Sequence, residues 1–191
     1  MSQPRARIVS SEDEELILVD SDDREIGHLS KAACHDGDGV LHRAFSVFLF
    51  DDEGRLLLQR RAQAKRLWPG YWSNSCCSHP RRGETLDVAA ARRLQDELHV
   101  DAELEFVYPF EYQARYGEAG SENELCSVFL GRMKGEPQAN ATEIDALRYV
   151  TVEELDDELA TTPERFTPWL KLEWQRLTGE FAARLKAYAD A

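Results

Sequence analysis

The sequence lacks several features that assign a protein to a class at first reading. It has no run of 18 apolar residues, and so no hydrophobic stretch long enough to cross a membrane as a helix. Its N-terminus is polar and acidic, without the apolar core of an export signal, and the chain carries no repeats or low-complexity tracts. These absences favour a cytoplasmic protein, and the length of 191 residues suits a single domain with a sizeable core.

Positive charge is also scarce. The 23 Lys and Arg residues face 36 Asp and Glu residues, and the net charge of −13 excludes nucleic-acid binding by bulk electrostatics. The basic residues nevertheless gather in one third of the chain, at Arg60, Arg61, Lys65, Arg66, Arg81, Arg82, Arg92 and Arg93. Such a cluster in an acidic protein suits a small anionic ligand such as a diphosphate, whereas scattered arginines would only be solvated surface charge.

Cysteine is limited to four residues, and no C-x-x-C pattern indicates a thiolate zinc site. A chain without an export signal is expected to keep its cysteines as thiols. Cys34, Cys76 and Cys126 are interpreted as small buried side chains. Cys77 has a second interpretation, because a thiol two residues before His79 could take part in acid–base chemistry beside a metal-binding imidazole.

The distribution of apolar residues predicts the fold class. Apolar runs bounded by turn residues predict strands over residues 16–19, 24–27, 43–50, 56–58, 104–107, 110–116, 124–130 and 147–150. Helical spacing and capping signals predict helices over 30–34, 85–100 and 167–188, and one that starts at the capping box of Thr151 and Glu154. This order predicts an α/β (α+β) domain, a mixed β-sheet covered by helices, with an N-terminal strand extension, a long C-terminal helix and a disordered tail over residues 1–10.

Three histidines and two glutamates form a candidate metal site. His35 and His42 flank a glycine-rich loop, and His79 follows the cysteine pair. Glu122 and Glu124 are two residues apart, which on a strand places both carboxylates on one face. Imidazoles with carboxylates suit Zn²⁺, Mn²⁺ or Fe²⁺. Taken singly, each histidine fits an ordinary surface or core position equally well, so the spacing alone leaves both interpretations open.

The segment from Gly83 to Val100 resembles the Nudix box, a loop–helix–loop motif that holds Mg²⁺ on a diphosphate. The positions that match are Glu84, Arg92 and Glu97. The positions that depart from the motif are Ser78, Arg93, Asp96 and His99. Two of these departures replace glutamates, which argues against ordinary Nudix hydrolysis. An i,i+4 ion pair of Arg93 with Glu97 is the structural alternative for this part of the helix.

From about Leu16 to Trp174 the chain resembles the type I isopentenyl-diphosphate Δ-isomerases, a family with the Nudix fold. The residues that carry the resemblance are Lys31, Ala33-Cys-His35, Leu41-His42, Arg60-Arg61-Ala62, Lys65, Trp68-Pro-Gly70, Trp72-Ser-Asn-Ser-Cys-Cys-Ser-His-Pro80, Gly83-Glu84, Glu122-Asn-Glu124 and Pro168-Trp169. The resemblance implies one Nudix-fold isomerase domain over 1–191, with a Nudix core at 43–155. It also implies conversion of isopentenyl to dimethylallyl diphosphate, for isoprenoid biosynthesis, by a 1,3-allylic proton shift through a carbocation-like intermediate.

The resemblance further implies a role for each matching residue. The catalytic residues would be Cys77, Glu124, Tyr112 and Trp169. The ligands of one tightly held Zn²⁺ or Mn²⁺ would be His35, His42, His79, Glu122 and Glu124. Glu97, with the backbone carbonyl of Cys77, would hold a Mg²⁺ on the diphosphate. The phosphate contacts would be Lys31, Arg61, Lys65, Ser78 and Arg93.

Two other functions fit parts of the sequence. A Nudix hydrolase of nucleoside or isoprenoid diphosphates would share the box, but the lost glutamates and the surplus metal-ligand set argue against it. A silent binding module would share the fold, but it would have no need for Cys77, Tyr112 and Glu124 together. The expected partner in each case is a small molecule, and neither nucleic acid nor a membrane is expected to bind. The protein itself is expected to be a monomer or a weak homo-oligomer.

Overall fold

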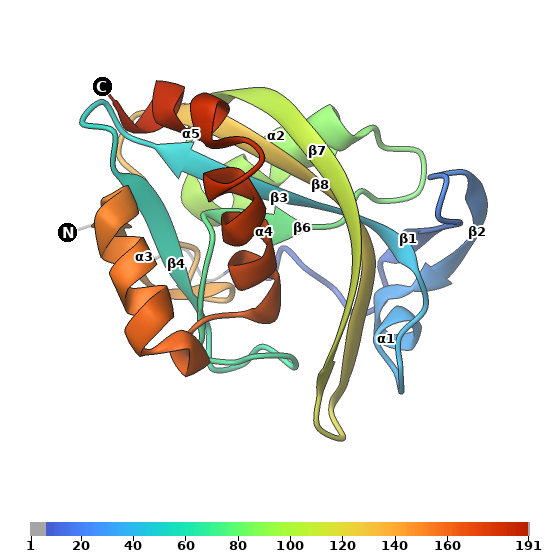
Figure 1. The fold of residues 1–191 in the computed structure, drawn as a ribbon. Coiled ribbons are helices and arrows are strands. Elements are labelled where there is room, and N and C mark those ends of the chain that lie inside the picture. Colours follow the sequence, from blue (N-terminus) through green and yellow to red (C-terminus); the bar gives the residue numbers. More distant parts are fainter. Residues whose placement is uncertain (1–6, 191) are drawn as a thin grey trace.

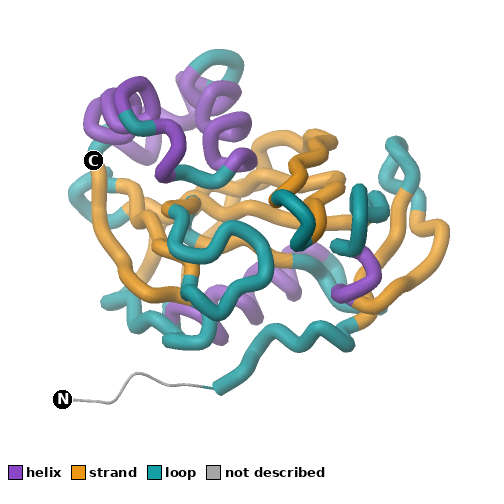
Figure 2. The backbone as a smooth tube through the Cα atoms, turned by 90° about the horizontal axis from the view of Figure 1, so that it is seen from below, coloured by secondary structure: helices purple, strands orange, loops and turns teal. Residues whose placement is uncertain are grey.

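The computed structural model describes residues 7–190, which form a mixed β-sheet between two layers of helix. Figures 1 and 2 show one helix, α2, on one side of the sheet and the C-terminal helices on the other. The strands are β1 (Glu15–Val19), β2 (Glu25–Ser30), β3 (His42–Phe50), β4 (Leu56–Arg61), β5 (Trp72–Ser73), β6 (Cys76–Ser78), β7 (Asp101–Tyr116), β8 (Gly120–Lys134) and β9 (Ile144–Val150). The helices are α1 (Lys31–Cys34), α2 (Leu86–Leu98), α3 (Val152–Thr161), α4 (Pro168–Thr178) and α5 (Ala182–Ala189), with a 3₁₀ turn at Pro163–Arg165. The predicted fold class is confirmed.

Strand β3 is the centre of the sheet. It pairs antiparallel with β1, β4 and β6, and parallel with β8. The parallel register sets His42 opposite Glu124 and continues to Phe50 opposite Arg132. Strand β6 adds Cys77 opposite Ser46 on the other edge of β3. Segments far apart in the sequence therefore meet along one strand.

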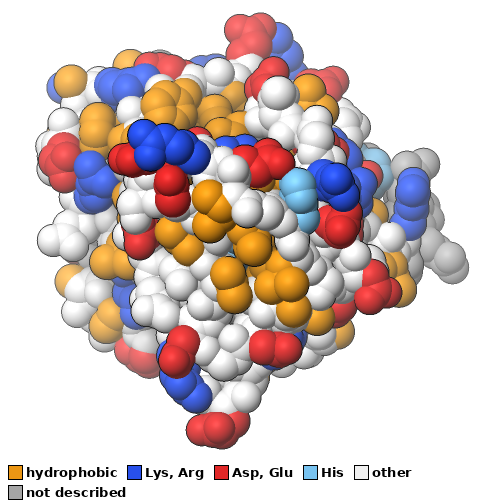
Figure 3. All heavy atoms as spheres, turned by 90° about the vertical axis from the view of Figure 1, so that its right-hand side faces the viewer, with side chains coloured by type: hydrophobic (Ala, Val, Ile, Leu, Met, Phe, Trp, Pro, Cys, Tyr) orange, Lys and Arg blue, Asp and Glu red, His pale blue; other side chains and the backbone are white. Residues whose placement is uncertain are grey.

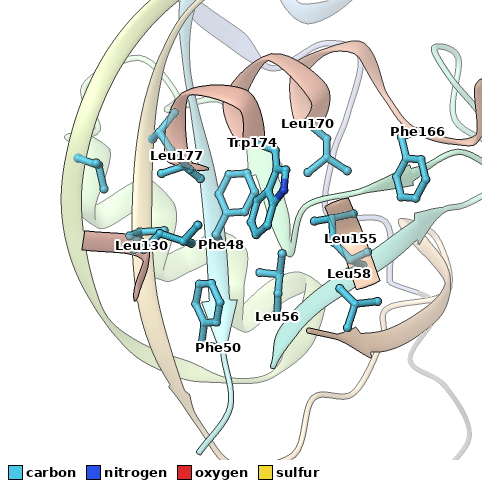
Figure 4. Packing of buried hydrophobic residues seen from close by; sticks show 14 of the residues in the cluster. Phe48, Phe50, Leu56, Leu58, Leu130, Leu155, Phe166, Leu170, Trp174 and Leu177 are labelled. Atoms are coloured by element: carbon cyan, nitrogen blue, oxygen red, sulfur yellow. The ribbon is translucent and has the colours of Figure 1, made fainter. Parts of the chain in front are cut away.

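The continuous apolar run of β3 is buried on both faces, as its composition indicates. Its odd-numbered residues pack toward α2, with Phe45 in the same cluster as Leu94. Its even-numbered residues Phe48 and Phe50 pack toward α4, where Trp174 stacks on Phe48 with ring centroids 6.2 Å apart (Figure 4). One strand thus supports two cores, one on each face of the sheet.

The predicted long C-terminal helix over 167–188 is wrong. The chain forms two shorter helices, because α4 ends at Gly179 and α5 begins after Phe181. Glycine has a low helix propensity, and the Thr178 hydroxyl also bonds back to the Trp174 carbonyl in the last turn. The apolar stripe still faces the body, so the break changes the direction of the chain without exposing the stripe.

The predicted disordered tail is wrong for residues 7–10, while residues 1–6 lie outside the described part. The Val9 side chain is buried, and its carbonyl accepts a hydrogen bond from Arg93 Nη1 at 2.7 Å. The Arg7 carbonyl accepts from Asn140 Nδ2 at 2.8 Å. These long-range bonds hold an irregular segment against the domain.

The hairpin of β7 and β8 is longer than predicted. The two expected strands over 104–107 and 110–116 are one strand, interrupted by a register shift between Phe106 and Tyr108. Pro109 is accommodated because β7 is an edge strand, so its missing N–H faces no partner. The turn of the hairpin extends beyond the rest of the sheet (Figure 1).

The face made by β1, β2, α1 and the hairpin turn mixes acidic and basic side chains around a smaller apolar area (Figure 3). Although the chain has a negative net charge, charged side chains of both signs are therefore mixed on this surface. None of the helices within residues 7–190 has the length and apolar character needed to span a membrane.

Candidate active site

A pocket lies between the strands β4, β6, β7 and β8 and the helices α1, α2 and α4, each of which contributes at least one lining residue. It encloses about 620 Å³ of empty space, solvent at its mouth included. One part of its lining is basic, with Lys31, Arg61, Lys65, Arg66 and Arg93. The other part carries His35, His79, Glu122, Glu124, Cys77, Tyr112 and Trp169. The pocket therefore joins a cationic half to a half rich in imidazole, carboxylate and aromatic groups.

The five predicted metal ligands come together. His35, His42, His79, Glu122 and Glu124 each offer a ligand atom, and these atoms all lie within 4.8 Å of one another. The strand register explains the assembly: Glu122 and Glu124 share a face of β8, and His42 is the β3 partner of Glu124. His79 follows β6, and His35 is the C-cap of α1. We call this group the His/Glu cluster.

Two histidines are oriented by backbone carbonyls. His35 Nδ1 lies 2.6 Å from the Lys31 carbonyl, and His42 Nδ1 lies 2.7 Å from the Val40 carbonyl. A carbonyl can only accept, so each Nδ1 carries a hydrogen. The neutral His42 ring then keeps its lone pair on Nε2. His35 differs, because burial alone would lower its pKa but the Glu122 charge raises it, and its Nε2 donates to Glu122 Oε2 at 2.8 Å. His42 Nε2 is buried and has no hydrogen-bond partner among the residues that the structure describes. This donor set fits a divalent cation, because an inward lone pair in a buried pocket is satisfied by a metal ion.

Burial and neighbouring charges divide the cluster into groups of different protonation. Burial lowers the pKa of His42 to about 4 and that of His79 well below its usual value, so both imidazoles are neutral. Burial raises the pKa of Glu124, and the Glu122 charge raises it further. Burial would also raise the pKa of Glu122, but the neighbouring His35 outweighs it and holds that pKa well below the usual range. One carboxylate is therefore ionised, while the other retains a proton.

The predicted proton-transfer residues surround the same pocket. The Tyr112 hydroxyl donates to Glu124 Oε2 at 2.6 Å. Cys77 is half-buried, and burial raises the pKa of its thiol to about 12, so it is protonated at neutral pH. The Trp169 indole lies beside both, with its ring centroid 6.4 Å from that of Tyr112. The Arg61 guanidinium lies 5.2 Å from the centroid of Trp169.

The predicted phosphate contacts all line the pocket, but each cation already has a protein partner. Lys65 Nζ lies 2.5 Å from Glu143 Oε2, and Arg93 Nη2 lies 2.5 Å from Glu97 Oε1. Lys31 Nζ bonds Ser10 Oγ at 2.5 Å. Lys31 also pairs with Glu12 at 3.4 Å, and Arg61 is held by backbone carbonyls, with Nη2 donating to the Leu67 carbonyl at 2.8 Å.

The two glutamates that match the Nudix box, Glu97 in α2 and Glu84 just before it, each accept hydrogen bonds from an arginine of α2. Glu97 lies behind the pocket wall, is 2% exposed and accepts from Arg93, so the i,i+4 pair considered from the sequence is formed. Glu84 accepts two hydrogen bonds from Arg92, both at 2.8 Å, and one from the backbone N–H of Arg81. The bonds between Glu84 and Arg92 therefore fasten the loop before α2 to the helix, whereas the pair of Glu97 with Arg93 lies within the helix.

Half of the basic cluster seen in the sequence reaches the pocket. Arg61, Lys65, Arg66 and Arg93 line it. Of the rest, Arg81 and Arg82 pair with Glu14 and Glu15 on the N-terminal segment, Arg92 pairs with Glu84, and Arg60 lies over Trp72.

Several residues at the site were not predicted from the sequence. Ser10, at the end of the segment expected to be a tail, and Glu12, just after it, line the pocket, and Glu143 pairs with Lys65 from 78 residues away. No sequence signal indicated them, because each contact is long-range. Leu67 lies between predicted residues and could have been found as their neighbour. As expected, Cys34, Cys76 and Cys126 are buried, and all four cysteines are free thiols in the described range.

Comparison with known proteins agrees with this geometry. The family model of the NUDIX domain matches residues 40–170. An isopentenyl-diphosphate Delta-isomerase of Serratia proteamaculans is 47% identical over 82% of this chain and 87% of its own length. A protein of the same name from Klebsiella pneumoniae is 41% identical over 91% of this chain and 98% of its own. Among solved structures, DR0079 from Deinococcus radiodurans has a TM-score of 0.70 at 23% identity, over 85% of this chain and 98% of that one, which shows the shared fold.

Proposed function

This chain belongs to the isopentenyl-diphosphate Delta-isomerases of the NUDIX domain family, and on that premise we propose that it converts isopentenyl diphosphate to dimethylallyl diphosphate. The observation that carries the proposal is the meeting of Cys77 with the Tyr112–Glu124 pair around one pocket. The reaction adds a proton to the terminal methylene carbon and removes one from the carbon two positions away. It needs an acid and a base on opposite sides of a five-carbon chain, together with a grip on the diphosphate.

Glu124 and Cys77 are the proposed proton-transfer residues. Glu124 is buried and hydrogen-bonded to Tyr112, so it can hold a proton and lose it to an alkene carbon while the tyrosine stays in contact. Cys77 reaches the pocket from β6, and its thiol can exchange a proton at the other carbon. Proton transfer at the two carbons is thereby assigned to residues on two different strands, Glu124 on β8 and Cys77 on β6.

The Trp169 indole is the proposed neighbour of the developing positive charge. The positively charged carbon of a tertiary carbocation bears no polar hydrogen that could form a conventional hydrogen bond, but it is attracted to the electron-rich face of an aromatic ring. Trp169 is 3% exposed, so the ring also excludes water that would quench the cation. Tyr112 and Trp68 pack around it and continue the apolar lining.

The His/Glu cluster is the proposed site of one tightly held divalent ion, Zn²⁺ or Mn²⁺. His35, His42, His79, Glu122 and Glu124 would hold it, and a bound ion would supply positive charge that increases the acidity of a ligating carboxyl. The unpartnered Nε2 of His42 supports this assignment.

The cationic half is the proposed diphosphate site. Lys31, Arg61, Lys65 and Arg93, with Ser78, line the part of the pocket that a diphosphate would occupy. Guanidinium and ammonium groups suit phosphate oxygens, and the binding energy positions the reacting carbons. Glu97 and the Cys77 carbonyl are proposed to hold a Mg²⁺ that accompanies the diphosphate.

The domain boundaries follow the same proposal. Residues 43–155 would form the Nudix core, and the segments before and after it complete the pocket. Ser10, Lys31 and His35 come from the N-terminal side, and Trp169 comes from α4. A core without these additions would lack two of its five proposed metal ligands, His35 and His42, and its proposed aromatic wall.

Incubation with isopentenyl diphosphate and Mg²⁺ tests the function directly. The expected product is dimethylallyl diphosphate, identified by its allylic proton resonances or its acid lability. Release of phosphate or pyrophosphate without isomerisation would instead assign a hydrolase, and binding of the diphosphate without any product would assign a binding module.

A further inference from the structure

The hydroxyl of Ser73 lies at the meeting point of two groups that the proposed reaction uses. Ser73 is fully buried in β5, directly behind the pocket wall. Its Oγ lies 2.9 Å from Trp169 Nε1 and 3.7 Å from Cys77 Sγ. The indole that faces the carbocation and the thiol that exchanges a proton therefore contact one oxygen atom.

The direction of each hydrogen bond can be assigned. An indole N–H is only a donor, so Trp169 donates to Ser73. Asn74 Nδ2 donates to the carbonyls of Val47 and Cys76, which turns its Oδ1 toward Ser73, and the Ser73 hydroxyl donates to that oxygen at 2.9 Å. Thr167 Oγ1 lies 3.2 Å away and donates to Ser73.

These three bonds use the whole capacity of the hydroxyl. Serine has one hydrogen to donate and two lone pairs to accept with. The hydrogen is taken by Asn74, and the lone pairs by Trp169 and Thr167. The Cys77 sulfur is thus held in contact with an oxygen that can neither accept its hydrogen nor donate to it. The thiol hydrogen stays available to the pocket.

We propose that Ser73 is a positioning residue that fixes the indole plane of Trp169 and directs the thiol of Cys77 into the pocket. This inference rests on the proposed function, which assigns those two residues their roles. Trp68 packs edge-on against Trp169, with ring centroids 5.3 Å apart, so the ring has an apolar support and a single polar anchor. Loss of the anchor leaves a buried N–H without a partner and lets the ring rotate away from the position that meets the cation.

Ser73→Ala tests the proposal, and Ser75→Ala is the matched control. Ser75 is also fully buried and two residues away, and its hydroxyl donates to the Leu57 carbonyl and accepts from the Leu49 N–H, whereas its hydrogen bonds in the described structure do not involve Trp169 or Cys77. Ser73→Ala is expected to lower kcat about tenfold or more with KM within about twofold, because the phosphate contacts are on other residues. Ser75→Ala is expected to lower the melting temperature with kcat within about twofold. Equal kcat losses in the two variants would overturn the proposal.

The indole N–H resonance of Trp169 gives a readout that does not depend on turnover. It is identified as the indole peak missing from Trp169→Phe. In the unmodified chain it is expected to exchange slowly with deuterated water, and in Ser73→Ala to shift and exchange faster. Rapid exchange in the unmodified chain would contradict the proposal even if the Ser73 variant failed to fold. An unmodified chain with no isomerase turnover but a slowly exchanging Trp169 N–H would instead refute the proposed function and leave this hydrogen bond in place.

Discussion

The two halves of the pocket differ in how their polar groups are satisfied. In the His/Glu cluster, strand register brings five ligand atoms together and leaves His42 Nε2 without a partner in the described chain. In the cationic half, the charged side chains that line the pocket are already bound to the protein, as in the pairs Lys65–Glu143 and Arg93–Glu97. The first half is arranged to receive a cation, whereas in the second an anion has to compete with carboxylates and carbonyls.

The difference has an electrostatic reason. Five unpaired cations in one pocket would repel one another and lose hydration, and burial does lower the pKa of Lys65 despite its partner. Internal carboxylates remove this cost in the free protein. The number of cations along the wall therefore overstates the net attraction that a diphosphate experiences, and Mg²⁺ bound with the diphosphate would help to balance the carboxylates.

The largest effect is expected from removing the two proposed proton-transfer groups, Cys77 and Glu124, of which Glu124 also belongs to the His/Glu cluster. Cys77→Ala and Glu124→Gln should each lower isomerase turnover by about 10³-fold or more, because no other group replaces a missing acid or base. Steady-state conversion of isopentenyl diphosphate measures this, with circular dichroism to verify folding. Cys34→Ala, which removes a buried thiol outside the pocket, is the control. Turnover near that of the control in either variant would refute its role.

The next largest effect is expected from removing a ligand of the proposed cation site in the His/Glu cluster. Purified protein should contain about one tightly held divalent ion per chain, and His42→Ala should lose most of it, with turnover reduced about 100-fold or more. Elemental analysis by mass spectrometry reads out the ion directly. His28→Ala, on the neighbouring strand β2, should retain it. A fully active protein that holds no ion would show that the cluster does not need a metal.

A smaller effect is expected in the cationic half. Glu143→Gln leaves Lys65 and Arg93 without their shared carboxylate, and the free energy of unfolding should fall by about 3 kcal/mol. Inorganic pyrophosphate should raise the melting temperature more in this variant than in the unmodified chain, since the anion takes the place of the lost charge. Glu103→Gln, in an exposed pair with Lys134, should change little. An equal or smaller pyrophosphate shift in Glu143→Gln would contradict the idea of an internal counter-ion.

The last expected effect is on the pH dependence of stability, with no change in turnover expected, and it rests on Glu173 of α4, a carboxyl that neither half pairs. Its Oε1 accepts from Cys126 Sγ at 3.6 Å, its Oε2 has no partner within residues 7–190, and burial raises its pKa to about 8 from 4.5. The native state thus keeps a proton that the unfolded state releases above pH 4.5. Stability should fall by up to about 1.4 kcal/mol per pH unit as the pH rises through that window, and level off above about 8.

Glu173→Gln should remove this contribution. In urea unfolding from pH 5 to 9, the free energy of unfolding of the variant should increase relative to that of the unmodified chain as the pH rises. The difference should be largest above pH 8. The difference between the two chains isolates Glu173 from the histidines, which titrate in both. A constant difference across this range would show that Glu173 is ionised in the native protein.

The sequence was most informative where function depends on spacing within one strand or helix. The two-residue interval of Glu122 and Glu124 and the capping box of Thr151 follow from local geometry, and both are present. The type I isomerase resemblance supplied the partners on other segments, and the structure brings the named metal ligands together. Local periodicity and motif residues were thus sufficient for the fold class and most of the pocket.

The remaining features depend on contacts that no local pattern records. The C-terminal stripe continues past Gly179, so periodicity alone could not indicate the break. The binding of the Val9 carbonyl by Arg93 joins residues 84 positions apart. Ser73 is an ordinary serine in a polar string until α4 brings Trp169 against it. Each case is a tertiary contact that overrides or adds to a local preference.

The parallel pairing of β3 with β8 makes correct folding and assembly of the His/Glu cluster depend on the same strand register. The even-numbered face of β3 carries His42 at one end and Phe48 and Phe50 at the other, and the same face of β8 runs from Glu122 to Leu130. A slip of one residue would turn the ligands away from the pocket and the phenylalanines out of the core in the same movement. Misaligned molecules are therefore eliminated by instability, and every molecule that has folded carries an assembled His/Glu cluster. Partial denaturation should lower the number of active molecules while the activity of each remaining folded molecule stays the same.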